Sequence, residues 1–527
     1  MSAWLVVSPI LVPLATASLC ALAWGRIPLQ RIISLTGSVA LFVCGALLLA
    51  HVSANGITAA QMSDWPAPFG ITLVADHLAA VMVLIAAVMA VAVAVYAFGD
   101  IAPERERYGF HPVFQTLMVG VCGSFITGDL FNLYVWFEVM LISSFMLLAL
   151  GGTREQIDGA IKYAAINLIA TASFLMAVAL LYGLTGTLNM ADLALRLREV
   201  EQTGIVTTVA VLFIIAFGMK AAVFPLFFWL PASYHTPAIP VQAIFAGLLT
   251  KVGVYALLRT FTLIFVGDTA WTHGLMLWIA GLTMAAGVLG SLAVTDLRRA
   301  FSWQVVAHIG YMIMGLALYT PLAIAGAVFY LVHDIVVKTN LFLGAGLARR
   351  LTGHDDLRAM GGLFKATPLL AIVMFVPLAS LAGFPPLSGF WSKLVLLQAS
   401  LEKEAYVIAA VSLIVGLLTM WLVGRIWAEL FWKAHPVADP QGTAAIAPGA
   451  RFALVAPLVL LSAMTVAIGL YAEPVMAVAE AASAELMDPT PYIEAVLGKG
   501  EPPPTAIVGL EPGDVQPAGV QPGEVRP

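Results

Sequence analysis

The stretch AFGMKAAVFPLFFWLP, Ala216–Pro231, places a single ammonium group, that of Lys220, inside an otherwise apolar run. Pro225 follows within the same run, and a second proline ends it. If the run crosses a membrane, a lysine near its middle costs about 2.5–3.5 kcal/mol on insertion scales. The fold and function inferred for this chain must therefore account for a charge and a helix-breaking residue within one span.

The composition of the chain is that of an integral membrane protein. Hydrophobic residues make up 61% and charged residues 10% of the 527 residues, and the mean hydropathy is +0.96. A soluble protein of this length could not bury so much apolar surface. The net charge of −5 is spread over loops and the C-terminal tail, so it indicates no nucleic-acid partner.

Uncharged runs of about 20 residues, each long enough to cross a bilayer as a helix, recur along the chain. They predict an all-α polytopic membrane protein with about 14 transmembrane helices. The first run is interpreted as a retained helix, since no basic stretch precedes it. The predicted spans cover residues 3–24, 32–52, 73–98, 112–128, 130–150, 160–184, 204–230, 240–265, 274–295, 302–319, 321–348, 367–399, 406–432 and 452–472.

The positive charges outside the spans are distributed unevenly. Loops that follow odd-numbered spans hold most of them, whereas the opposite side holds only Arg196, Arg198, Arg259 and Lys403. This asymmetry predicts that the odd-numbered loops are cytoplasmic and that both termini are extracytoplasmic.

The C-terminal tail has a different composition from the rest of the chain. From about Glu501 it is rich in proline and glycine and lacks aromatic residues. Residues 473–527 are therefore predicted to form an extracytoplasmic, disordered tail, with the alanine-rich segment Ala472–Leu486 on the outer surface. The functional part of the chain is expected to end near residue 475.

Few ionisable residues lie inside the spans. They are, in chain order, Glu138, Lys220, Lys251, Lys338, Lys393 and, nearer a helix end, Arg425. Such groups normally face the interior of a helix bundle and mark ion or proton pathways. Desolvation weakens a lysine's hold on its proton and a nearby carboxylate strengthens it, so a lysine whose partner changes can load and release a proton. We therefore predict that Lys220 carries protons and is poised against Glu138.

Several of these residues also have a purely structural interpretation. Glu138 could pair with a lysine only to hold two helices together. Lys338 follows Asp334 by four residues, and Glu429 follows Arg425 by four, so each pair could be a local ion pair on one helix face. For Arg425 and Glu429 this interpretation is favoured.

Lys393 could lie in a water-filled entrance, and His308 and His333 could each be ordinary core residues. The proton-transfer interpretation is favoured because a glutamate and four lysines lie on five separate spans. His333 is included in the predicted proton path, with His308 and Asp334 in secondary roles. The cysteines Cys20, Cys44 and Cys122 fall inside apolar runs, so no metal site and no cofactor is predicted.

Prolines predict a break in two spans. Pro225 follows Lys220 in the seventh span, and Pro385 and Pro386 precede Lys393 in the twelfth. Interrupted helices at corresponding positions in two halves are typical of transport sites. Because five is an odd number, a five-helix unit that is duplicated in tandem has its second copy inverted in the membrane. Residues 112–265 and 273–433 are therefore predicted to be inverted repeats. Residues 1–111 would then hold the first three spans and residues 450–472 the last.

Around these residues the chain resembles a known family, the antiporter-like subunits shared by Mrp cation/proton antiporters and respiratory complex I. The resemblance covers nearly all of residues 60–435 and is strongest to the D subunit of Mrp antiporters. It is carried by the stretches GDLFNLYVWFEVMLISSFMLLALGGT, LTGTLNMADLA, WLPASYHTPAIPVQAIFAGLLTKVGVYALLRTFTLIF, FYLVHDIVVKTNLFLGAG and LAGFPPLSGFWSKLVLL.

The resemblance implies 14 spans in inverted repeats, broken seventh and twelfth helices, and a proton path along the middle of the membrane. Its functional glutamate and broken-helix lysine match Glu138 and Lys220, and its central lysine matches Lys251. The family's eleventh-span pair is represented by His333 and Lys338, and its twelfth-span residue by Lys393. Gln242 departs from the small hydroxyl residue that many relatives carry there.

These observations favour a proton-translocating, non-catalytic subunit of a multi-subunit Na⁺(K⁺)/H⁺ antiporter in a bacterial cytoplasmic membrane. Its expected partners are the other Mrp subunits, membrane lipid, and H⁺ with Na⁺, K⁺ or Li⁺ as transported ions. The alternative is the equivalent pump subunit of an NADH-quinone oxidoreductase or a membrane-bound hydrogenase. A transferase using His308 or His333 as base, or a mere scaffold, is disfavoured because neither requires four intramembrane lysines.

Overall fold

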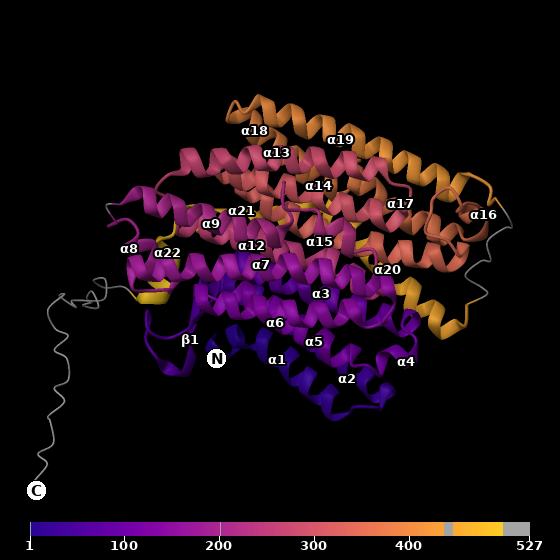
Figure 1. Cartoon of the computed structure of the whole chain (residues 1–527), viewed down its shortest axis with the longest axis horizontal. Helices are drawn as coiled ribbons and strands as arrows, with labels where there is room; N and C mark the ends of the chain where they lie inside the picture. The colour runs from indigo at the N-terminus through magenta and orange to yellow at the C-terminus, as the bar shows by residue number, and fades with distance from the viewer. Residues whose placement is uncertain (1, 201, 437–445, 499–527) are drawn as a thin grey trace, which may run out of the picture.

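The computed structural model describes residues 2–200, 202–436 and 446–498, which form an elongated bundle of helices that run mostly along one direction (Figure 1). Within these residues, 12 helices are long and apolar enough to cross a membrane, and α5 and α17 are shorter apolar helices. The prediction of an all-α polytopic membrane protein is confirmed.

The first half of the chain contains a small hairpin in addition to its helices. The two strands pair antiparallel, with Thr58 opposite Ala75. The elements are α1 (Ser2–Leu22), α2 (Ile27–Asn55), β1 (Thr58–Gln61), the short turn η1 (Met62–Asp64), β2 (Thr72–Ala75), α3 (His77–Asp100), α4 (Pro103–Glu106), α5 (Phe110–Ile126), α6 (Leu130–Ala149), α7 (Arg154–Thr185), α8 (Met190–Arg196), α9 (Thr203–Ala221), α10 (Trp229–Ser233), α11 (Ile239–Ile244), the π-helical turn η2 (Phe245–Leu249) and α12 (Thr250–Leu263).

The second half consists of helices joined by loops, with no strand among its described residues. Many helices of the bundle begin at a side chain that caps them, for example Asp296 and Thr320, which accept hydrogen bonds from the first turns of α14 and α15. The elements are α13 (Thr269–Ala293), α14 (Leu297–Leu318), α15 (Pro321–Thr352), α16 (Leu363–Ala366), α17 (Pro368–Ala382), α18 (Ser388–Glu402), α19 (Tyr406–Trp427), the π-helical turn η3 (Ala428–Trp432), α20 (Pro448–Leu470), α21 (Ala472–Met487) and α22 (Thr490–Leu497).

Both helix breaks expected from proline are present. Pro225 lies between α9 and α10, and Pro385 and Pro386 lie between α17 and α18. Proline lacks the N–H that would continue the helical ladder, so the helix before it ends with unpaired carbonyl groups. A third irregularity, the π-helical turn η2, interrupts the helix predicted over residues 240–265 and was not expected from the sequence.

The helices differ in how far the rest of the chain encloses them. We compare the buried fraction of residues over the most apolar 18-residue segment of each span. It is 100% for α11–α12 and 94% for α14 and for α15, but 39% for α7 and for α13. The enclosed helices carry Lys251, His308 and Asp334. The less buried helices instead present large apolar side chains such as Ile161 and Trp278 at the surface, as expected for helices that contact lipid or partner helices.

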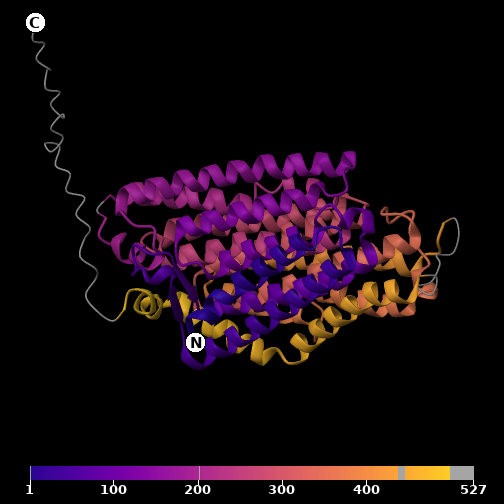
Figure 2. The same cartoon turned by 90° about the horizontal axis from the view of Figure 1, so that it is seen from below.

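The segment after the last span is ordered, which corrects the prediction of a disordered tail from residue 473. The helices α21 and α22 fold back onto the bundle, and α21 packs against α15 and α3. Figure 2 shows the yellow C-terminal helices along one edge of the molecule. Ser483 Oγ donates to Pro321 O at 2.7 Å, and Glu485 lies 2.7 Å from His77 Nδ1. The rest of the predicted tail, residues 499–527, lies outside the described residues.

Two glycines allow the broken helices to approach their neighbours. A Cβ at Gly253 on α12 would lie 2.6 Å from Ala221 N, at the end of α9. A Cβ at Gly389 on α18 would lie 1.8 Å from Ser380 O on α17. Both distances are shorter than a van der Waals contact with backbone, so neither position accepts a side chain without displacing a helix.

We predict that Gly253→Ala lowers the thermal stability of the purified protein. The added methyl group would push α12 away from the end of α9, at a cost of about 1–3 kcal/mol. Gly183→Ala on α7 is the matched control, because no heavy atom lies within 4 Å of its would-be Cβ. Equal thermal midpoints for the two variants would contradict the close helix contact.

Candidate functional site

Asp334, on α15, lies at the centre of a group of fully buried charges. Lys251 Nζ, on α12, is 2.7 Å from its Oδ2, and His308 Nδ1, on α14, is 2.9 Å from its Oδ1. Lys338 Nζ, one turn further along α15, is 3.9 Å from Oδ1. All four side chains have no exposed surface. One carboxylate therefore joins three helices and faces two lysines.

The local ion pair considered for Asp334 and Lys338 is present at 3.9 Å, but it is not the closest charge contact of Asp334. The carboxylate is closer to Lys251, which comes from a different helix. Lys338 Nζ has no hydrogen-bond partner among the described residues. A buried charge without a hydrogen-bond partner is costly, and charges at membrane depth mark candidate proton-transfer sites.

Lys251 lies directly after the π-helical turn. Its Nζ donates to Ala246 O at 2.6 Å as well as contacting Asp334. A π-helical turn disturbs the usual i to i−4 bonding and is frequent at functional sites. Here it brings a backbone carbonyl within reach of the ammonium group.

Lys220 occupies the last turn of α9, just before the first helix break. Its Nζ donates to Thr171 Oγ1 on α7 at 3.1 Å and lies 5.4 Å from the centre of the Phe137 ring. The charge of Glu138 acts on it electrostatically. However, Glu138 Oε1 is buried and has no hydrogen-bond partner among the described residues. Glu138 and Lys220, which were expected to be poised against each other, therefore form no direct ion pair in this structure.

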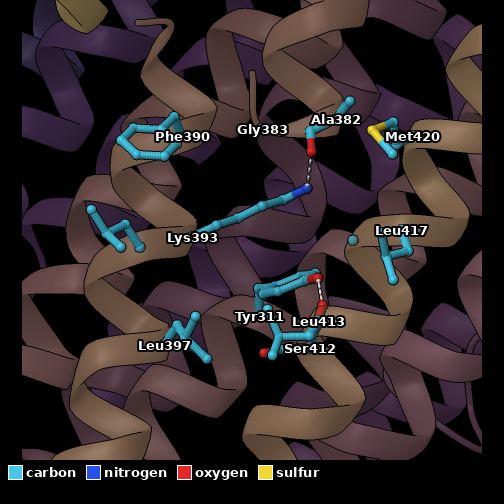
Figure 3. Close-up of a pocket in the computed structure, with 12 residues that line it drawn as sticks. Tyr311, Ala382, Gly383, Phe390, Lys393, Leu397, Ser412, Leu413, Leu417 and Met420 are labelled. Atoms are coloured by element: carbon cyan, nitrogen blue, oxygen red, sulfur yellow. Dashed lines mark hydrogen bonds between the residues drawn. The ribbon is translucent and has the colours of Figure 1, made fainter. Parts of the chain in front are cut away.

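Lys393, on α18, is held by the second helix break. Its Nζ donates to Leu381 O at 2.8 Å and to Ala382 O at 3.3 Å. These are the last carbonyls of α17, which have no helical partner and carry the negative end of the helix dipole. Figure 3 shows the lysine reaching across a pocket of about 430 Å³ towards Ala382, with Tyr311 beside it. Lys393 is thus partly exposed at a mostly apolar pocket, and backbone carbonyls bind its ammonium group.

Two hydroxyl-bearing residues connect these groups and were missed in the sequence. Tyr330 OH lies 3.0 Å from His308 Nδ1, and its ring stacks on Tyr311 at a centroid distance of 5.3 Å. Ser388 Oγ lies 2.8 Å from His333 Nδ1. Tyr330 stands four residues before Asp334, so helical spacing from a suspected carboxylate could have pointed to it.

The predicted site residues thus form a discontinuous row. Lys251, Asp334 and His308 are in direct contact, with Lys338 at 3.9 Å. Lys220 makes no hydrogen bond or ion pair with this group among the described residues, and α9 packs against α12, with Gly253 close to Ala221. His333 and Lys393 lie at the second break and are joined to the central group through aromatic and hydroxyl contacts.

The geometry also tests the local ion pair favoured for Arg425 and Glu429. Arg425 Nη1 donates to Leu292 O at 3.0 Å, whereas Glu429 pairs with Lys433 at 2.7 Å. The favoured Arg425–Glu429 pair is therefore wrong, although both groups do have a structural role. Among the described residues, no group of three or more His, Cys, Asp or Glu is placed to hold a metal ion.

Gln242 stabilises the connection between α10 and α11. Its Nε2 donates to Pro237 O at 2.7 Å and to His235 O at 3.1 Å. Burial, with Arg299 and Arg298 nearby, lowers the pKa of His235 to about 4. His235 is therefore neutral at neutral pH, and this connection adds no positive charge to the row.

Comparison with known proteins places this geometry in a family. A sequence model described as "NADH:quinone oxidoreductase/Mrp antiporter, TM" matches residues 127–419. The chain is 47% identical over 493 residues to the D subunit of the Na(+)/H(+) antiporter of Alkalihalophilus pseudofirmus, covering 94% of this chain and 99% of the relative. It is 41% identical over 492 residues to the protein of the same name from Bacillus subtilis, with 93% and 99% covered.

Solved structures share the whole architecture. A chain of the Mrp complex from Dietzia sp. DQ12-45-1b matches with a TM-score of 0.86 and 31% identity, covering 94% of this chain and 99% of that one. A chain of respiratory complex I from Thermus thermophilus matches with a TM-score of 0.78 and 23% identity, covering 92% and 100%, and so shares the fold.

These matches define a polytopic membrane subunit of the antiporter and complex I type. The chain belongs to the NADH:quinone oxidoreductase/Mrp antiporter family. Its similarity to D subunits of Na⁺/H⁺ antiporters, predicted from the sequence motifs, is confirmed.

We predict that Asp334→Ala destabilises the protein far more than removal of an exposed ion pair. The substitution leaves Lys251 as an uncompensated buried charge, which costs about 3–5 kcal/mol. The matched control is Asp158→Ala, whose partner Lys162 is four residues away and half exposed, so that about 0.5 kcal/mol is expected. Thermal midpoints of the purified variants measure the difference in stability. A similar decrease of the midpoint in both variants would show that the buried ion pair stabilises the protein no more than the exposed one.

Proposed function

We propose that this chain is the proton-translocating subunit of a multi-subunit monovalent cation/proton antiporter. The observation that carries the proposal is the group of fully buried charges in which Asp334 faces Lys251, His308 and Lys338. Charges at membrane depth that join several helices are characteristic of ion and proton pathways. The relatives are named as D subunits of Na(+)/H(+) antiporters, which supports an antiporter role.

In this proposal protons pass between the two helix breaks. One entry lies near Glu138 and Lys220 at the first break, and the other lies at Lys393 at the second. Between them, Lys251, Lys338 and the histidines His308 and His333 exchange protons as their distances to Asp334 change. Each charge that crosses the membrane is worth about 2.3 kcal/mol per 100 mV, so a membrane potential can drive the shifts in lysine protonation.

The transported cation would be Na⁺, with K⁺ or Li⁺ as alternatives that share its chemistry. Such cations need oxygen ligands, and the interior of this chain offers few carboxylates. The cation route therefore lies partly or wholly in partner subunits of an Mrp-type complex. The chain would act in a bacterial cytoplasmic membrane as a secondary transporter subunit rather than an enzyme, with both termini outside.

The second candidate is the corresponding pump subunit of a respiratory complex. It is favoured by the match to a chain of the membrane-bound sulfane sulfur reductase, an archaeal respiratory membrane complex, at a TM-score of 0.85 and 26% identity. The higher sequence identity to antiporter D subunits makes the antiporter the first choice. Proton transfer along the same row is expected in either assembly.

The proposal is tested by Na⁺-dependent proton movement in inverted vesicles that carry the native operon. Lys220→Ala and Glu138→Ala should each lower exchange by at least about tenfold, the size of effect typical of a lost proton-transfer group. Lys162→Ala, an exposed lysine with its own carboxylate partner, should leave exchange unchanged. Assembly of the complex is measured in the same membranes, and unchanged exchange in both test variants would refute the proton path.

A further inference from the structure

A second polar site lies at one end of the bundle, away from the row of buried charges. It is a pocket of about 490 Å³ where α3, α4, α7, α14 and α15 come together with the segment that leads into α11. Its charged lining consists of two carboxylates and four arginines, with no lysine among the described lining residues: Asp100, Glu155, Arg105, Arg298, Arg349 and Arg350.

Arg298 is the innermost of these arginines. It is only 8% exposed, and its Nη2 donates to Asp355 Oδ2 at 2.7 Å. Its Nε is buried and has no hydrogen-bond partner among the described residues. Arg349 Nε shares the same oxygen of Asp355, at 3.2 Å. A single carboxylate oxygen therefore binds two guanidinium groups. Each guanidinium has five N–H donors, so some N–H groups of both arginines are not used in these ion pairs.

The other two arginines form no ion pair among the described residues, although both act on the charge of Asp100. Arg350 Nη1 donates to a neutral acceptor, Gly99 O, at 2.6 Å, and Arg105 has no ion pair within the part of the chain that the structure describes. Asp100 accepts a backbone hydrogen bond from Ile239 and is surrounded by arginines. The arginines of the pocket therefore outnumber its carboxylates, and some of their N–H groups remain free to donate hydrogen bonds to a ligand.

We infer that this pocket binds a phosphate group, carried either by the headgroup of an anionic phospholipid or by a soluble phosphate. Guanidinium forks bind phosphate oxygens in pairs, a geometry that lysine cannot reproduce. The volume is in the range of small-molecule sites, roughly 300–1,000 Å³. The candidate spans His77–Asp100 and Pro321–Thr352 end here, and the ends of membrane-spanning helices lie near the lipid headgroups.

A phosphate at this position would connect helices that carry the buried charges. Arg298 begins α14 and Arg350 ends α15, and the same helices hold His308 and Asp334. The ligand would therefore fix the ends of two helices whose middles meet at the central carboxylate. The site itself does not depend on whether protons move along the row.

The experiment uses the assembled, delipidated complex and two probes. One probe is inorganic phosphate, compared with chloride at equal ionic strength, and the other is phosphatidylglycerol, compared with phosphatidylcholine in otherwise identical nanodiscs. Binding is followed by the shift of the thermal midpoint and by retention of lipid in native mass spectrometry. The test variant is Arg105→Gln with Arg350→Gln, which leaves both ion pairs of Asp355 intact.

We expect the native complex to respond to at least one probe, and the double variant to bind it about tenfold or more weakly, as for loss of charge-assisted bonds. Arg358→Gln is the control, because this exposed arginine pairs with Asp356 outside the pocket; it should bind within about twofold of the native affinity. A response to phosphatidylglycerol alone identifies a lipid headgroup, and a response to phosphate in the lipid-free sample identifies a soluble ligand.

Two results would overturn the inference. One is the absence of any response to either probe in the native complex. The other is an equal loss of binding in the double variant and in Arg358→Gln, which would mean that only net charge matters. Arg298→Gln provides a further variant, and its assembly is checked first because Arg298 also holds Asp355.

Discussion

Charged groups can remain inside a membrane protein only if opposite charges and hydrogen-bond partners replace the water that they lose. In this chain that constraint falls on Asp334, which binds Lys251 and His308 and lies 3.9 Å from Lys338. Its partners come from three helices, so the crossing of α12, α14 and α15 is fixed by charge as well as by packing. These are also among the most enclosed helices of the bundle.

The helix irregularities serve the same electrostatic purpose. Each break or π-helical turn frees backbone carbonyls, and two of the buried lysines donate directly to carbonyls freed in this way. Lys393 binds the end of α17, and Lys251 binds Ala246 within the π-helical turn. For Lys251 and Lys393 the helix irregularity and the lysine are therefore parts of one arrangement, in which backbone carbonyls replace the solvent that the ammonium groups lack.

Features that depend on local sequence could be predicted, and features that depend on tertiary contacts could not. The spans follow from apolar runs, and the breaks follow from Pro225, Pro385 and Pro386. The close partner of Asp334, Lys251, could not be predicted, because it is distant in sequence. Helical spacing points instead to Lys338, four residues away. The hydrogen bond from Lys220 to Thr171 on α7 did not follow from the sequence for the same reason. The order of α21 and α22 depends on their packing against α15 and α3.

The central claim is that a buried lysine releases and rebinds its proton while remaining the partner of Asp334. Na⁺-dependent proton movement of the Lys251→Arg variant in inverted vesicles tests it most directly. Arginine keeps the positive charge that Asp334 needs but does not give up its proton. With assembly of the complex verified in the same membranes, the account predicts that exchange is lost. Exchange at the native rate would contradict it, because a fixed charge would then be sufficient.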